Sequence, residues 1–269
     1  MLGELARFLA DEVSGGLAPD LVVITGDLAF TGKPKEYELA ETWLQKLWQI
    51  LSVGPSDPLP PDRLLLVPGN QDADPERVSK GARSMQDGLL DEGSQDAIAE
   101  MLEDRDDRTS LLKRHTAYQK LYAHWLGQPQ PLPWWQRAID IGGQRLHVAG
   151  LSSAWLAGGD ETEDRGHLLL GRYQLHQTVL HASAGDADWR IALMHHPWDH
   201  LALFDADEAR ETIHLHCDLV LRGHSCEPSA SHFVPADPKR ACLELSAGCV
   251  DPSAPHNAFQ WIELYPGPK

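Results

Sequence analysis

The chain has 269 residues, of which 42% are hydrophobic and 23% are charged, and 40 acidic against 23 basic side chains give a formal net charge of −17. A chain of this length and composition can bury a large core, which excludes a wholly disordered protein. The excess of acid argues against general nucleic-acid binding and against binding to anionic membranes, since both need a basic face.

The cysteines indicate a reducing compartment. The chain has four cysteines, which are too few for a disulfide scaffold and form no Cys-x-x-Cys pair: Cys217, Cys226, Cys242 and Cys249. We expect Cys217, Cys242 and Cys249 to be small buried hydrophobic residues. No apolar run approaches the roughly 18 residues of a membrane span, so we expect a cytoplasmic protein without a membrane segment.

The first part of the chain alternates between helical and strand patterns. A helix over 2–13 precedes a buried strand over 21–25, and a helix over 36–52 precedes a second buried strand over 64–67. Residues 72–107 are acidic and polar, and a further helix follows over 110–126. We expect one domain over 1–269 with a largely helical insertion at about 72–135.

The second part of the chain completes an α/β layer fold. A hairpin over 138–151 turns at Gly142 and Gly143, and a helix follows near 171–183. The later strands are expected at 191–194, 218–222, 242–246 and 259–265.

Four of these strands end on a side chain that can bind a metal. Asp27 and Asn70 follow the first two buried strands, each after a glycine, and His195 and His224 follow the strands at 191–194 and 218–222. Ligands of α/β sheets bind outside the carboxyl ends of the strands. This mixed oxygen and nitrogen set suits Mn²⁺, Fe or Zn²⁺ better than Ca²⁺.

The ordered motifs GDLAF, GNQD, HHP and GHSC resemble the calcineurin-like metallophosphoesterase superfamily, over roughly residues 1–265. The resemblance implies a four-layer α/β/β/α sandwich of two mixed sheets flanked by helices. It implies two metals that activate a bridging hydroxide and clamp the phosphoryl oxygens. Asp27 would be the bridging carboxylate, and Asn70, His195 and His224 would complete one metal site.

The chain departs from the family pattern in the other half of the site. No Asp-x-His precedes Asp27, and Cys226 stands where the family has the last histidine of Gly-His-x-His. Gln71 replaces the histidine that helps to protonate the leaving group, and an amide has no titratable proton for this task. Cys226 would bind a metal only as a thiolate. We therefore expect a degenerate or N-terminally truncated member that lacks the first strand and holds one divalent ion (Mn, Fe or Zn) rather than two.

Two functions remain open from the sequence. One is a phosphoesterase-type hydrolase of reduced activity, in which Asp27, Asn70 and Gln71 act on a phosphomonoester or phosphodiester such as a phosphorylated small molecule or nucleotide. The alternative is an inactive pseudoenzyme that serves as a binding or scaffolding module for a partner protein.

Other polar residues near these motifs have less defined roles. His196, Asp199 with His200, and Arg222 are substrate-side candidates, with a solvated loop (Asp199, His200) or a plain strand end (Arg222) as the alternatives. We expect the HLHC segment at 214–217 to end a helix or to enter a strand, and not to form a separate zinc site.

Overall fold

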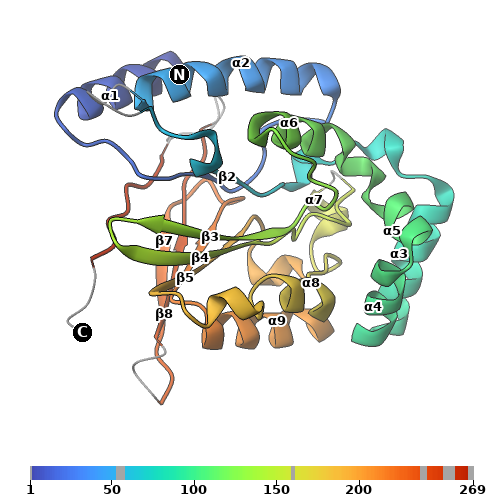
Figure 1. The fold of residues 1–269 in the computed structure, drawn as a ribbon. Coiled ribbons are helices and arrows are strands. Elements are labelled where there is room, and N and C mark those ends of the chain that lie inside the picture. Colours follow the sequence, from blue (N-terminus) through green and yellow to red (C-terminus); the bar gives the residue numbers. More distant parts are fainter. Residues whose placement is uncertain (1, 53–57, 159–160, 237–240, 251–257, 266–269) are drawn as a thin grey trace.

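Two β-sheets lie against each other between layers of helices in the computed structural model, which describes residues 2–52, 58–158, 161–236, 241–250 and 258–265 (Figure 1). Among these residues, β1 and β2 form a parallel pair, and the larger sheet has the order β3-β4-β5-β6-β8-β7. The strands are β1 (Val22–Ile24), β2 (Leu64–Leu66), β3 (Trp135–Ile141), β4 (Gln144–Gly150), β5 (Trp189–Met194), β6 (Leu219–Arg222), β7 (Ser229–Phe233) and β8 (Cys242–Ser246).

Helices cover the outer faces of both sheets. In Figure 1, α1, α2 and α6 lie beyond the small sheet, and α8 and α9 lie beyond the large one. The helices are α1 (Leu2–Ser14), α2 (Pro34–Leu51), α3 (Lys80–Glu92), α4 (Gln95–Glu103), α5 (Arg105–Leu112), α6 (Thr116–Leu126), α7 (Glu161–Asp164), α8 (Arg172–Gln177) and α9 (Leu203–His216). The predicted four-layer α/β/β/α fold is confirmed, although the small sheet is purely parallel rather than mixed.

The central strands are apolar because both of their faces are buried. Ile191 and Leu193 of β5 pack with Leu64 and Leu66 in the core between the sheets, whereas the alternate residue Ala192 packs on the side of α8 and α9. Strands buried on both faces read as continuous hydrophobic runs. This packing holds the carboxyl ends of β1, β2, β5 and β6 in fixed positions.

The hairpin prediction is correct, and some predicted boundaries are not. Gly142 and Gly143 both have positive φ, which the hairpin turn between β3 and β4 requires. The helix predicted over 110–126 is interrupted by a 3-10 turn at Lys113–His115 between α5 and α6. The helix predicted near 171–183 ends as α8 at Gln177.

The strand predicted over 259–265 is wrong. Residues 258–265 are described without regular structure, and β8 pairs instead with β7. Every residue of β7 is exposed, so its sequence lacks the apolar pattern that would reveal a strand.

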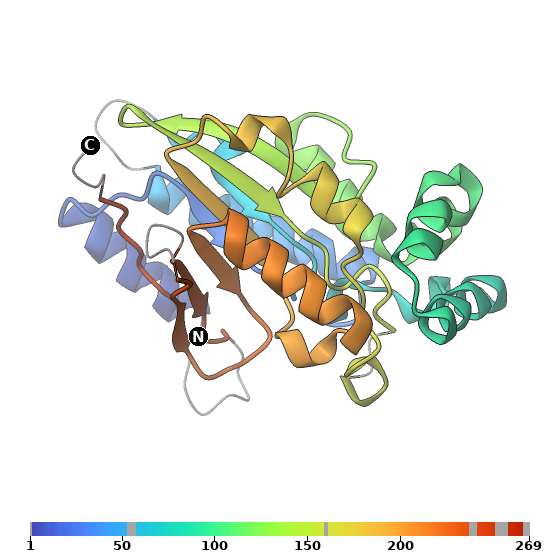
Figure 2. The same cartoon turned by 90° about the horizontal axis from the view of Figure 1, so that it is seen from below.

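Helices α3 to α5 stand at one end of the molecule, beside rather than on the sheets (Figure 2). Their apolar side chains Leu89, Ile98 and Leu111 form a separate cluster with Trp155. No helix in the described part of the chain combines the length and apolarity that crossing a bilayer requires.

Two of the four cysteines do not have the predicted state. Cys226 and Cys249 form a disulfide, while Cys217 and Cys242 are free and buried as expected. The sequence could not show the pairing, because it arises from β6 and β8 being parallel neighbours in the sheet. The loops that leave these two strands begin side by side, which brings the cysteine Cα atoms to 4.6 Å.

Candidate metal centre

The candidate centre lies where the loops after β1, β2, β5 and β6 converge. Asp27 and His224 each follow a glycine and have positive φ values of 58° and 65°, a conformation uncommon for residues with a side chain. Gly26 allows the turn to approach His195, because a Cβ there would lie 2.4 Å from the His195 Nδ1. Such strained positions are often found at functional sites.

Three of the predicted ligands are in direct contact. The Asp27 Oδ2 lies 3.3 Å from the His195 Nε2, and the His224 Nδ1 lies 3.2 Å from the same nitrogen. The His195 Nδ1 donates to the Thr25 carbonyl at 2.6 Å, which leaves Nε2 facing the cluster. Atoms that bind one tetrahedral cation at about 2.0–2.1 Å lie about 3.3 Å from each other, so both separations fit a shared ion.

Asn70 lies in the turn that contacts Asp27. Its side chain is buried, and its Oδ1 has no hydrogen-bond partner among the described residues. The neighbouring Gln71 donates its backbone N–H to the Asp27 Oδ1 at 3.0 Å. A buried carbonyl oxygen without a donor is costly, and a bound cation would satisfy it.

Asp27 and His195 each stabilise the charged form of the other. Burial by itself would raise the pKa of Asp27, but the charge of His195 and the hydrogen bonds from His195 and Gln71 hold that pKa below its usual value. Burial would likewise lower the pKa of His195, and the Asp27 carboxylate raises it instead. His195 would have to lose its Nε2 proton to hold a cation here, and the cation would then supply the positive charge beside the Asp27 carboxylate.

Asp72 anchors the two turns and was given no role by the sequence. This fully buried carboxylate accepts hydrogen bonds from the backbone N–H groups of Asp27 (2.8 Å), Ala29 (3.0 Å) and Gly69 (2.9 Å), and from the Tyr37 hydroxyl (2.8 Å). Burial and the neighbouring charge of Asp27 raise the pKa of Asp72 to about 6. The last residue of the GNQD motif is a signal that could have identified it.

Two further histidines join the centre. The nitrogens of His196, His195 and His224 all lie within 4.8 Å of one another. The His200 ring is 4.5 Å from the His224 ring and stacks on His196 at 5.4 Å, centre to centre. The sequence made His196 a substrate-side candidate and left His200 between the substrate side and a solvated loop. In the structure both rings lie against the His224 ring.

The two remaining substrate-side candidates form ion pairs with other residues. Asp199 is exposed and forms an ion pair with the exposed Arg165. Arg222 donates to the Glu244 carboxylate at 3.0 Å.

Cys226, bound to Cys249, is not available as a thiolate ligand in this state. His214 of the HLHC segment lies in the last turn of α9, as expected for a helix end, and contacts the buried Glu244.

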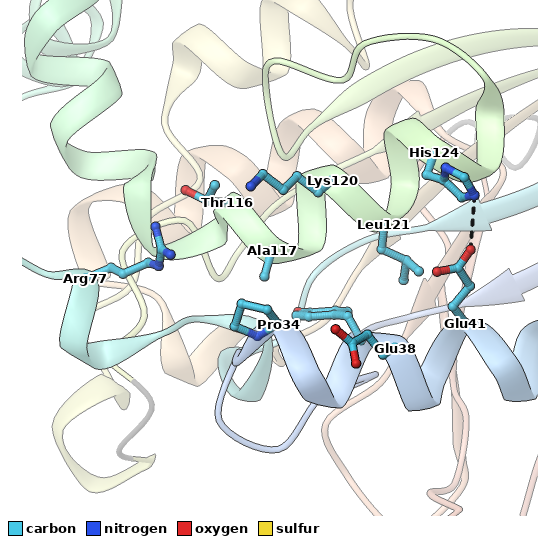
Figure 3. Close-up of a pocket in the computed structure, with 10 residues that line it drawn as sticks. Pro34, Glu38, Glu41, Arg77, Thr116, Ala117, Lys120, Leu121 and His124 are labelled. Carbon is cyan, nitrogen blue, oxygen red and sulfur yellow. Dashed lines mark ion pairs between the residues drawn. The ribbon is translucent and has the colours of Figure 1, made fainter.

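A separate groove of about 210 Å³ lies between α2 and α6. Figure 3 shows Glu38 of α2 facing Leu121 and Ala117 of α6, with an ion pair between His124 and Glu41 at one end. None of the histidines of the candidate centre lines this groove. The groove is therefore separate from the candidate metal ligands.

Comparison with known proteins yields a family match that covers most of the chain. No curated protein matches the chain. A solved structure of a hypothetical protein from Thermus thermophilus matches with 12% identity over 92% of this chain and 72% of that one, at a TM-score of 0.39. The family model for calcineurin-like phosphoesterases matches residues 2–228. The chain, with its donors at the expected strand ends, belongs to the calcineurin-like phosphoesterase family.

Proposed function

We propose that this chain hydrolyses a phosphomonoester or phosphodiester with one divalent cation held by Asp27, Asn70, His195 and His224. The observation that carries the proposal is the pair of contacts of 3.3 Å and 3.2 Å that join Asp27 and His224 to the same His195 nitrogen. The buried, unpartnered Oδ1 of Asn70 supports it independently.

Asp27 and Thr25 have different roles in the proposed site. When bound, the cation supplies Lewis-acid polarisation of the phosphoryl group and lowers the pKa of the attacking water. Asp27, aligned by the N–H of Gln71, neutralises part of the positive charge. Thr25 holds the His195 ring in the tautomer whose Nε2 can bind.

The side chain of Gln71 donates a hydrogen bond to a phosphate oxygen and cannot supply a proton to the leaving group. The enzyme therefore favours esters with good leaving groups.

The alternative is a binding module without turnover. It is favoured by Gln71 in place of a proton donor and by the disulfide of Cys226, which occupies the position of a family ligand. In this case the same cation would bind a phosphorylated ligand or the phosphate of a partner without cleaving it.

Metal counting and turnover together distinguish these functions. The chain is equilibrated with Mn²⁺ or Zn²⁺, freed of excess metal, and assayed with a bis-aryl phosphate. We expect about one ion per chain, with turnover that Asp27→Asn abolishes and that the exposed control Asp207→Asn leaves unchanged. One bound ion without turnover favours the binding module, and a chain that binds no ion contradicts the proposed metal site.

A second variant tests the role of Gln71. Gln71→His restores a titratable group beside the substrate, so we expect faster hydrolysis of esters with poor leaving groups and little change with activated esters. An equal change for both ester classes would contradict the assigned defect.

A further inference from the structure

His196 is a buried imidazole whose outer nitrogen has no hydrogen-bond partner among the described residues. The side chain is fully buried, and its Nε2 is without a donor or acceptor in that part of the chain. The ring is also fixed on its other edge, where Nδ1 lies 2.9 Å from the Ser153 Oγ. The same oxygen accepts the backbone N–H of His196 at 3.0 Å.

The free edge of this ring belongs to the histidine cluster. The ring centres of His196 and His195 are 4.7 Å apart at 86°, and those of His196 and His224 are 4.9 Å apart at 47°. Nitrogens of all three rings lie within 4.8 Å of one another. Buried polar atoms are nearly always paired, so an unpaired nitrogen beside two candidate ligands itself points to a bound cation.

The hydrogen bond on the other edge of the ring fixes which nitrogen is available. In a neutral imidazole one nitrogen carries the lone pair, and a Ser153 hydroxyl that accepts the Nδ1–H places that lone pair on Nε2. A neutral imidazole nitrogen is the form that binds metals.

We propose that His196 is a ligand of the cation, so that His195, His196 and His224 present three imidazole nitrogens beside the Asp27 carboxylate. This inference rests on the proposed metal site and extends it to a nitrogen-rich donor set. Imidazole-rich sites suit Zn²⁺, whereas Mn²⁺ prefers oxygen ligands. The centre is therefore selective for Zn²⁺ over Mn²⁺.

The test measures metal affinity rather than activity. Zn²⁺ and Mn²⁺ dissociation constants are determined for the full chain by competition with a chelator, for the wild type and for His196→Phe. We expect His196→Phe to weaken Zn²⁺ binding by more than roughly tenfold, since changing even a partner that only orients a ligand typically costs about 10–100-fold. Mn²⁺ prefers oxygen ligands, so its binding should weaken by a smaller factor and the Zn²⁺ preference should fall.

A matched control separates ligand loss from a general effect of changing a buried histidine. His147 is also buried, but its Nε2 bonds to the Thr178 carbonyl at 2.9 Å and it lies outside the cluster. His147→Phe should leave both dissociation constants unchanged. Thermal unfolding of each metal-free variant checks its folding.

A milder variant serves if His196→Phe does not fold. Ser153→Ala keeps the imidazole and removes its hydrogen bond, so it should weaken Zn²⁺ binding by a smaller factor. The visible spectrum of bound Co²⁺ should also change in this variant, because the orientation of one nitrogen ligand has changed.

The outcomes are distinguishable from failure of the proposed function. A wild-type chain that binds neither metal overturns the metal site and the proposed function together. A wild-type chain that binds both, with Zn²⁺ affinity and Co²⁺ spectrum untouched by the His196 and Ser153 variants, overturns only the role of His196.

Discussion

Gly69 is the position where one methyl group tests the geometry of the whole centre. Its φ of −100° suits any residue, so Gly69→Ala adds no backbone strain. The new Cβ, however, would lie 2.0 Å from the Asp27 Oδ1 and 2.7 Å from the His195 Cε1. Ordinary contact begins at 3.4 Å, so the Asp27 carboxylate has to retreat by about 1.4 Å, several times the 0.2 Å tolerance of a metal–ligand distance.

Two effects of known size follow from this movement. Overpacking a close-packed site costs about 1–3 kcal/mol, so we expect the free energy of unfolding to fall by about 2 kcal/mol. Displacing Asp27 also breaks its 3.0 Å hydrogen bond with the Gln71 N–H and its 3.3 Å contact with His195. We expect the metal affinity to fall by roughly 10–100-fold or more, the loss that typically follows when the groups that orient a metal ligand are changed.

Gly88→Ala is the matched control. Gly88 lies inside α3, and a Cβ there meets nothing within 4 Å. Alanine in a helix interior is favoured over glycine by about 0.8–1 kcal/mol, so this variant should be slightly more stable and bind metal normally. Urea unfolding and chelator competition measure both quantities. If Gly69→Ala unfolds and binds metal like the wild type, Asp27 does not lie against this turn and the described geometry is refuted.

Three further predictions concern contacts that surround the centre. Tyr37→Phe removes the hydroxyl that donates to Asp72 and should lower the free energy of unfolding, measured by urea titration, by about 1.5–3 kcal/mol. The control Tyr118→Phe removes a buried hydroxyl without a hydrogen-bond partner among the described residues and should leave that free energy unchanged. Equal losses in the two variants would contradict the role of Asp72. Burial alone would raise the pKa of Glu244, but its hydrogen bonds and a nearby arginine hold it below the usual 4.5, so its contribution is present above pH 4.5 and is lost as the pH falls through the lowered pKa. Glu244→Gln should therefore be less stable than the wild type at neutral pH and nearly equal below that pKa, and a constant difference would argue against an ionised carboxylate. Cys249→Ser removes a disulfide that spans 23 residues and should lower the free energy of unfolding by about 3 kcal/mol. A thiol reductant should destabilise the wild type but not this variant. If the reductant destabilised both equally, reduction of this disulfide would not explain the loss of stability.

The sequence predicted those parts of the centre that are encoded locally. A buried strand, a glycine and a donor lie next to one another in the chain, so Asp27 and His224 could be identified without knowing the sheet order. Their contact with His195 then follows from the family fold, in which the carboxyl ends of these strands converge. The strand ends were therefore predictable, although the distances between the side chains were not.

Other features depend on which segments become neighbours in space. The Cys226–Cys249 disulfide follows from β8 lying beside β6, while the exposed strand β7 intervenes between them in sequence and has no apolar pattern. The place of His200 depends on the 3-10 turn Trp198–His200, which returns the chain toward His224. A short local sequence pattern does not show where such a turn directs the chain. A solvated loop was therefore an equally good prediction for His200.

The departures from the family pattern stand beside buried polar atoms that have no partner among the described residues. Gln71 and the disulfide-bonded Cys226 stand where the sequence comparison expects histidines, and the buried Nε2 of His196 has no hydrogen-bond partner among the described residues. In a site that had lost its ligand, we expect the polar side chains to be paired with each other or exposed to water. An unpaired buried polar atom destabilises the fold. The retention of strained φ values at Asp27 and His224 points the same way, since this strain persists only where the surrounding structure maintains it. These features are the ones that a cation in the histidine cluster would explain, and they support the proposed metal site whether or not the chain also cleaves an ester.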